Sequence, residues 1–305
     1  MKRRARLFSA LVLALAFVTP TLGQAEAPAP RPKRLGVVGF YNPRLMYLKY
    51  QPLADYLSEK TGATWELLIS ADYDETVRRL CAGEVDLAYL GPLTYVKANS
   101  VCGARAVVRL QTGGKDSFRS YVMVRSDSPA KSLADLSGKR IGFGSPLSTS
   151  AHLVPFAMMV HADVFSDPRT TCINFGHHER AARACLIGEV DACGVRDIIG
   201  DRFLDRGLRV LATSEPIPNF PLVASPKTDA TTIDRVVAAL VDMPAQDARL
   251  RARMAAWDPE LASGFVRAQG DEYERIRRLA LEILGADFSR KSESDLACPA
   301  GIREP

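Results

Sequence analysis

Three hydroxyl side chains follow one another within the stretch GFGSPLSTSAHLVP (142–155). Ser148, Thr149 and Ser150 stand between a Gly/Pro turn and an apolar run, where a helix is expected to begin. One hydroxyl is enough to cap a helix N-terminus. Three in succession, beside free amides and the positive end of a helix dipole, predict a site for an anion with several oxygen atoms. Capping alone is the alternative. Nucleoside triphosphate is not favoured, because the run has no Lys or Arg and the chain has no GxxxxGK[ST] motif.

The N-terminus has the order of a secretory signal. Basic residues at positions 2, 3, 4 and 6 precede an apolar run over 7–18 and a small-residue stretch at 23–25. We therefore predict a signal peptide over 1–25, a Pro/Ala-rich linker over 26–34 and a periplasmic location. The apolar run is shorter than a membrane span, which needs about 20 residues.

The predicted cleavage also changes the net charge. The 305-residue chain carries +5, and removal of four basic and no acidic residues leaves +1. A nearly neutral mature chain argues against nucleic acid as a partner.

Six cysteines in an exported protein allow up to three disulfides. Cys81 and Cys102 flank one strand-loop-helix segment and are the favoured pair, while the pairing of the others stays open. Free buried thiols are the alternative. No spacing is that of a CxxC metal or redox pair, so we expect no metal and no cofactor.

The elements that must carry the hydroxyl run follow a βαβαβ order, which is typical of a parallel sheet covered by helices. Hydrophobic spacing and turn residues predict strands over 35–40, 65–70 and 85–90 and helices over 45–60 and 73–82.

A second unit of the same build follows the first. The phrase LCAGEVDLAYLG (80–91) is echoed by CLIGEVDACGV (185–195), and strands are predicted over 118–125 and 170–175. The stretch 209–225 reads as a strand broken by prolines, which suggests a chain that crosses between two bodies.

These patterns predict an α/β protein with two lobes and two hinge crossings. Lobe 1 comprises 35–117 and 218–288, and lobe 2 comprises 118–217. From Thr232 onward the pattern is helical and is expected to pack on lobe 1, whereas the tail 289–305 has no clear pattern.

Several segments resemble the phosphonate- and phosphite-binding, PhnD-like family of periplasmic binding proteins, which feed ABC transporters. The similarity covers nearly all of 35–285, is specific at the Ser-Thr-Ser-x-His-Leu-Val-Pro core and looser elsewhere. It implies the type II, Venus-flytrap fold, with the ligand between the lobes. The segments are KYQPLADYLSEKTG (49–62), ADYDETV (71–77), VDLAYLGPLTYV (85–96), FRSYVMVRSDSPAKSLADLSGKRIGFGSPLSTSAHLVP (118–155) and SEPIPNF (214–220).

The resemblance implies that Ser148, Thr149 and Ser150 bind the oxygens of a tetrahedral phosphorus group. His178 matches a family histidine at the start of the next helix. Asp197 falls near an acidic position of the family, and a carboxylate there would accept a proton from a P–OH group. A surface Asp that begins a helix is the alternative.

Aromatic residues complete the implied site. Tyr73 matches an aromatic side chain that closes the cleft, and Tyr89 is expected to do likewise, with core packing as its alternative. Phe118 and Phe220 stand where some members hold an aminoethyl tail with a Tyr and an Asp. An ammonium group would lose its partners there, so phosphite, methylphosphonate or phosphate is expected rather than aminoethylphosphonate.

The expected function is a periplasmic solute-binding protein, a monomer, that delivers a small phosphorus oxyanion to an ABC transporter permease in the inner membrane. A sensor component that signals to a membrane histidine kinase or chemoreceptor is an alternative. A Ser/His hydrolase is a weaker one, because the chain has no GxSxG elbow.

Overall fold

The structure is a computed structural model. It describes residues 31–38, 43–111, 114–241 and 264–298, together with positions 243, 250, 252, 254, 257, 260 and 261. The predicted signal peptide and most of the predicted linker lie outside the described residues. Across the residues described, no helix is both long enough and apolar enough to cross a membrane.

The first lobe is built on a mixed sheet of six described strands in the order β13-β4-β12-β3-β1-β2. β1 runs parallel to both β2 and β3, as the βαβαβ order predicts, whereas β12 and β13 run antiparallel to β4. The strands are β1 (Lys33–Val38), β2 (Trp65–Ser70), β3 (Leu87–Tyr89), β4 (Arg105–Leu110), β12 (Pro221–Ala224) and β13 (Phe265–Arg267).

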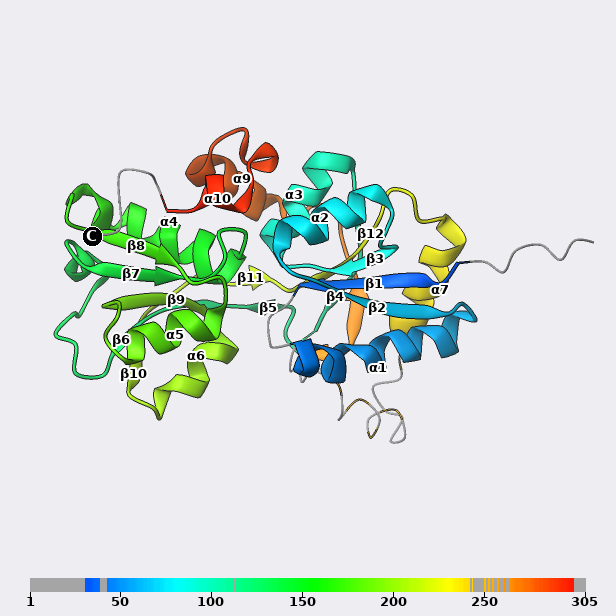
Figure 1. The fold of residues 1–305 in the computed structure, drawn as a ribbon, viewed down its shortest axis with the longest axis horizontal. Helices are drawn as coiled ribbons and strands as arrows, with labels where there is room; N and C mark the ends of the chain where they lie inside the picture. The colour runs from blue at the N-terminus through cyan, green and yellow to red at the C-terminus, as the bar shows by residue number, and fades with distance from the viewer. Residues whose placement is uncertain are drawn as a thin grey trace, which may run out of the picture. The chain divides into compact units, whose positions relative to one another are not determined.

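Helices cover both faces of this sheet. Figure 1 shows α1 on one face and α2 and α3 on the other. Asp72 caps α2, because its carboxylate accepts the Glu75 amide at 2.7 Å, and Gly83 ends the helix in the left-handed conformation. The helices of this lobe are α1 (Pro43–Thr61), α2 (Tyr73–Ala82), α3 (Pro92–Cys102), α7 (Ala230–Val241) and α9 (Glu274–Leu284).

The second lobe has its own mixed sheet, in the order β10-β6-β9-β7-β8. In Figure 1, α4 lies on one face of the sheet and α5 and α6 on the other. Separate clusters of buried apolar side chains line the two faces. The elements are β6 (Ser120–Arg125), β7 (Arg140–Phe143), β8 (Thr171–Asn174), β9 (Ala192–Arg196), β10 (Leu208–Thr213), α4 (Val154–His161), α5 (His178–Leu186) and α6 (Asp197–Leu204), with short 3₁₀ turns at Leu133–Leu136 and Val164–Ser166.

Two short strands carry the chain between the sheets. β5 (Ser117–Phe118) leads from β4 to β6, and β11 (Ile217–Pro218) leads from β10 back to β12. The two pair antiparallel, with Ile217 opposite Phe118. The broken strand predicted over 209–225 is therefore three strands, and the two-lobed α/β fold with two crossings is confirmed.

The C-terminal part differs from its prediction in two ways. The pattern after Thr232 was expected to be helical throughout, but Phe265–Arg267 forms β13 on the edge of the first sheet. A strand of three residues is too short to show a period of its own. The described part of the tail also has regular structure, with a 3₁₀ turn at Phe288–Arg290 and α10 (Glu293–Leu296), which begins with a capping box at Ser292.

Cysteine pairing agrees with the favoured pair and adds a second one. Within the described chain, Cys81 bonds to Cys102 and Cys172 bonds to Cys298, while Cys185 is free and buried, as is its neighbour Cys193. The Cys172–Cys298 bond fixes the C-terminal tail to β8 of the second lobe.

Candidate functional site

The hydroxyl run begins a helix at the end of β7. Residues 149–153 form one π-helical turn that continues into α4, and the Leu153 amide donates to the Ser148 carbonyl at 3.0 Å. The amides before Leu153 precede the first such bond and point toward the helix start. Gly144 lets the end of β7 approach this turn closely, because a Cβ atom at position 144 would come within 2.7 Å of the Ala151 Cβ. All three hydroxyl side chains are buried.

Thr149 joins this helix start to another one. Its Oγ1 accepts the Leu93 amide at 2.8 Å, and Leu93 is the second residue of α3, a helix with no side-chain cap of its own. The Thr149 proton remains available for donation. The positive ends of two helices therefore meet at Thr149, one from each lobe, and such ends favour negative charge.

Ser148 carries out the capping role and also gathers polar side chains. Its Oγ accepts a hydrogen bond from the Ala151 amide at 3.1 Å and lies 3.2 Å from His178 Nε2. It also forms a hydrogen bond with the Tyr73 side chain. Burial and the charge of Glu293 raise the pKa of Tyr73, so its phenol stays protonated and can donate.

The tautomer of His178 follows from its second contact. The Arg196 amide donates to His178 Nδ1 at 3.2 Å, so in the neutral ring the proton is on Nε2, the atom that faces Ser148. Burial, followed by the charges of Arg196 and His177, lowers the pKa of His178 to about 3. His178 is therefore a neutral donor at physiological pH.

Asp197 has other partners. Its Oδ2 accepts the Arg119 amide and its Oδ1 accepts its neighbour's amide at Ile198, each at 2.8 Å. Asp197 is also the first residue of α6. This geometry favours the interpretation of Asp197 as a residue that begins a helix, and it does not place the carboxylate with Ser148.

Arg196, one position earlier, is the charged residue that sequence reasoning missed. Neighbouring residues of a strand point to opposite faces, and Arg196 ends β9 with its side chain 6% exposed. Its Nη1 donates to Glu260 Oε2 at 2.6 Å, and its guanidinium lies 4.3 Å from the Phe118 ring centre and 4.4 Å from that of Phe220. The sequence signal for Arg196 was its place at the end of an apolar, strand-like stretch, one residue before Asp197.

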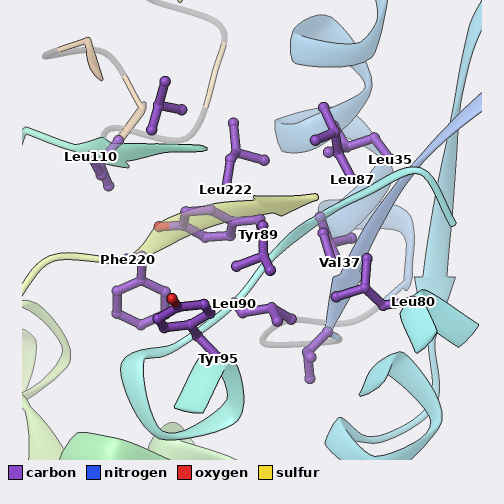
Figure 2. Close-up of a cluster of buried hydrophobic side chains, with 14 of the residues drawn as sticks. Leu35, Val37, Leu80, Leu87, Tyr89, Leu90, Tyr95, Leu110, Phe220 and Leu222 are labelled. Atoms are coloured by element: carbon purple, nitrogen blue, oxygen red, sulfur yellow. The ribbon is translucent and has the colours of Figure 1, made fainter. Parts of the chain in front are cut away.

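Tyr89 belongs to the core of the first lobe, which was the alternative for it. Figure 2 shows Tyr89 and Phe220 among the buried apolar side chains of this sheet. The two rings stack at 5.2 Å, and the Tyr89 hydroxyl donates to Glu260 Oε2 at 3.1 Å. Tyr89 thus supports the aromatic wall rather than adding a hydroxyl beside Ser148.

The structure therefore groups the predicted residues into two adjoining sets. Ser148, Thr149, Tyr73 and His178 form a set of hydrogen-bond donors at the helix starts, and Phe118, Phe220 and Tyr89 form an aromatic wall. Arg196 connects the sets through its amide. A cavity of about 30 Å³ next to the wall is lined by Tyr50, His178, Glu179, Arg196, Ile199, Phe220 and Glu260.

His178 is the one side chain of the donor set of a type that commonly binds metal ions. No cluster of three or more His, Cys, Asp or Glu side chains that could hold a metal ion occurs in the described part of the chain.

Comparison with known proteins supplies the family. Residues 35–273 match the model of the periplasmic substrate-binding proteins of phosphonate ABC transporters. The chain belongs to this family. Its members bind a substrate for a transporter and are not enzymes, and the described disulfides are typical of a protein outside the cytoplasm.

Two curated relatives fit this assignment. The chain is 31% identical over 222 residues to the phosphate-import protein PhnD of Mycolicibacterium smegmatis. The aligned region covers 66% of this chain and 67% of the relative. It is 25% identical over 248 residues to the phosphonates-binding periplasmic protein of Escherichia coli. Here the aligned region covers 76% of this chain and 72% of the relative.

A solved structure shows the same fold. The PhnD1 protein of Prochlorococcus marinus, in complex with methylphosphonate, is similar with a TM-score of 0.73 and 17% identity, over 83% of this chain and 98% of that one. This is the two-lobed type II fold of periplasmic binding proteins.

Proposed function

We propose that this periplasmic binding protein captures a small phosphorus oxyanion, namely phosphite, methylphosphonate or phosphate, and delivers it to an ABC transporter permease. The observation that carries the proposal is the meeting of two helix starts at Thr149, with Ser148, Tyr73 and His178 around it. Every one of these groups can donate a hydrogen bond. A set of hydrogen-bond donors at two helix starts suits a tetrahedral oxyanion.

The aromatic wall limits the substituent on phosphorus. Phe118, Phe220 and the buried Arg196 pack together beside the donor set and leave only a small cavity there, of about 30 Å³. The relatives named for phosphate and for phosphonates support both ends of this ligand range.

The remaining parts of the proposal concern the chain as a whole. We propose that residues 1–25 direct export and are removed, and that 26–34 is a linker. Lobe 1 is proposed to comprise 35–117 with 218–288, lobe 2 118–217 and the tail 289–305. The strand membership of the two sheets supports these limits.

Calorimetry on the mature protein tests the proposal. Phosphate, phosphite, methylphosphonate, aminoethylphosphonate and sulfate are titrated under one set of conditions. Phosphite, methylphosphonate or phosphate is expected to bind most tightly. Tighter binding of sulfate, or equal or tighter binding of aminoethylphosphonate, would contradict the proposed ligand class.

A further inference from the structure

The side chain of Arg196 is enclosed as a ligand would be. Its guanidinium packs against both Phe118 and Phe220, at 4.3 and 4.4 Å from their ring centres, and the two rings contact each other with their centres 5.3 Å apart. Glu260 completes the enclosure, since its Oε2 accepts from Arg196 Nη1 and from the Tyr89 hydroxyl. We call Phe118, Phe220, Glu260 and Tyr89 the cation cage.

Aromatic faces combined with a carboxylate recognise organic cations, because ring quadrupoles and a negative charge attract the same group. Here the cation belongs to the chain itself. The four residues come from several parts of the chain: β5, β3, the segment before β12 and the stretch at 260. The cage is therefore a feature of the tertiary structure, formed around one side chain.

The cage adjoins the proposed anion site. The Arg196 amide donates to His178 Nδ1, and the opposite ring nitrogen faces Ser148. Arg196 Nε is buried and has no hydrogen-bond partner among the residues that the structure describes. His178 also lines one cavity with Arg196, Phe220 and Glu260, so a group that replaced the guanidinium would lie beside the ring that contacts Ser148.

We infer that the cage is a cation subsite of the ligand cleft, which Arg196 occupies in place of a ligand's ammonium or guanidinium group. Arg196 then determines specificity: it excludes ligands with a cationic tail, and its removal opens the subsite to them. The position of the cage relative to the phosphorus group rests on the proposed function. The cage itself does not.

Chemical rescue tests the cage without any phosphorus compound. Arg196→Ala is expected to lower the melting temperature, and millimolar guanidinium or ethylammonium is expected to restore part of it in a dose-dependent way. Wild type should not respond. The matched control is the double variant Arg196→Ala/Glu260→Gln, which keeps the space but lacks the carboxylate charge. Absence of rescue in the single variant, or equal rescue in the double variant, would overturn the inference.

Ligand selectivity tests the placement of the cage. Aminoethylphosphonate and ethylphosphonate have two-carbon tails and differ in the ammonium group. Arg196→Ala is expected to raise the affinity ratio of the former to the latter by about tenfold or more over wild type. Arg196→Lys, which keeps a cation in the cage, should retain the wild-type ratio. An unchanged ratio in Arg196→Ala, or an equal rise in Arg196→Lys, would overturn the inference.

The two experiments separate the possible failures. If no phosphorus oxyanion binds wild type or variants, the proposed function fails, and rescue by guanidinium still decides whether the cage is a cation subsite. If Arg196→Ala does not fold, the wild-type ratio decides. Wild type must then bind ethylphosphonate at least as tightly as aminoethylphosphonate, and the reverse order would overturn the inference.

Discussion

His178 is fixed as a neutral donor by one backbone amide and by burial. Its ring contributes a hydrogen bond without a charge, so the attraction of the cleft for an anion comes from the helix ends.

The pKa of His178 falls from 6.5 to about 3 on folding, and the unfolded chain therefore binds a proton that the folded chain does not. Stability is expected to decrease as the pH falls from about 6.5 toward about 3, with a slope of up to about 1.4 kcal/mol per pH unit from this residue. His178→Asn should flatten the dependence measured by urea unfolding at about pH 7 and about pH 5. Buried His152, with a pKa lowered to about 4, adds a slope of its own that this variant should retain. An unaltered slope would show that His178 is not held neutral.

Ser150→Ala separates ligand binding from capping most cleanly. Loss of a charge-assisted hydrogen bond costs roughly 1.5–3 kcal/mol, so the affinity for the best phosphorus oxyanion should fall about tenfold or more while the melting temperature stays nearly constant. Ser132→Ala, in the capping box before the 3₁₀ turn at Leu133–Leu136, is the control and should alter stability alone. A lowered melting point with unchanged affinity in Ser150→Ala would return the residue to a structural role.

Thr149→Ala has two expected effects. Sequence reasoning predicts weaker binding with a constant melting temperature, but the bond from the Leu93 amide to Thr149 Oγ1 is lost as well. Stability should therefore fall by about 1 kcal/mol in addition to the tenfold loss of affinity. Calorimetry and thermal unfolding of the same sample measure both, and a change in only one of them would contradict this dual role.

Sequence reasoning reached the donor set because three hydroxyls at a helix start are a local pattern. The ion pair of Arg196 and Glu260 could not be predicted in this way, because it joins residues 64 positions apart and depends on the face of β9 to which the Arg196 side chain points. For the same reason, the sequence points to Asp197 as a ligand-binding residue and not to the neighbouring Arg196.

At the scale of elements, the C-terminal tail has a clear structural role that its sequence pattern does not indicate. The Glu293 carboxylate accepts the Tyr73 amide at 2.9 Å and the Ser145 hydroxyl at 2.8 Å, so α10 contacts both lobes near the donor set. Capping residues at 292 and 295 mark this helix, but its single turn is too short for an apolar period. The βαβαβ order was predictable because long amphipathic helices and buried strands carry that period, whereas β13 and α10 depend on tertiary contacts.

The two disulfides are expected to differ in their contribution to stability. The closed segments span 126 residues for Cys172–Cys298 and 21 residues for Cys81–Cys102. By loop-closure entropy, Cys298→Ser should cost about 5 kcal/mol and Cys102→Ser about 3 kcal/mol. Urea unfolding of the two variants gives the order. A greater loss in Cys102→Ser would mean that the tail is not covalently held in solution.

At the scale of the whole molecule, we expect a monomer with or without ligand. Each described sheet is covered by its own helices, and the large apolar side chains that remain exposed are spread over the chain at Tyr47, Leu48, Val101, Val160, Ile187, Leu204 and Leu281. Light scattering coupled to gel filtration measures the mass directly. A stable dimer without ligand would contradict the expectation.

The two crossings between the sheets look alike, since β5 and β11 pair with each other, yet the covalent connectivity makes them unequal. A single break near Glu215, before β11, leaves two fragments that the Cys172–Cys298 bond still joins. A single break before β5 leaves Cys81 and Cys102 on one fragment and the other bonded pair on the second, so no described disulfide links the pieces. A nick in the return crossing is thus hidden until a reductant is added, whereas a nick in the outward crossing divides the molecule at once under denaturing conditions.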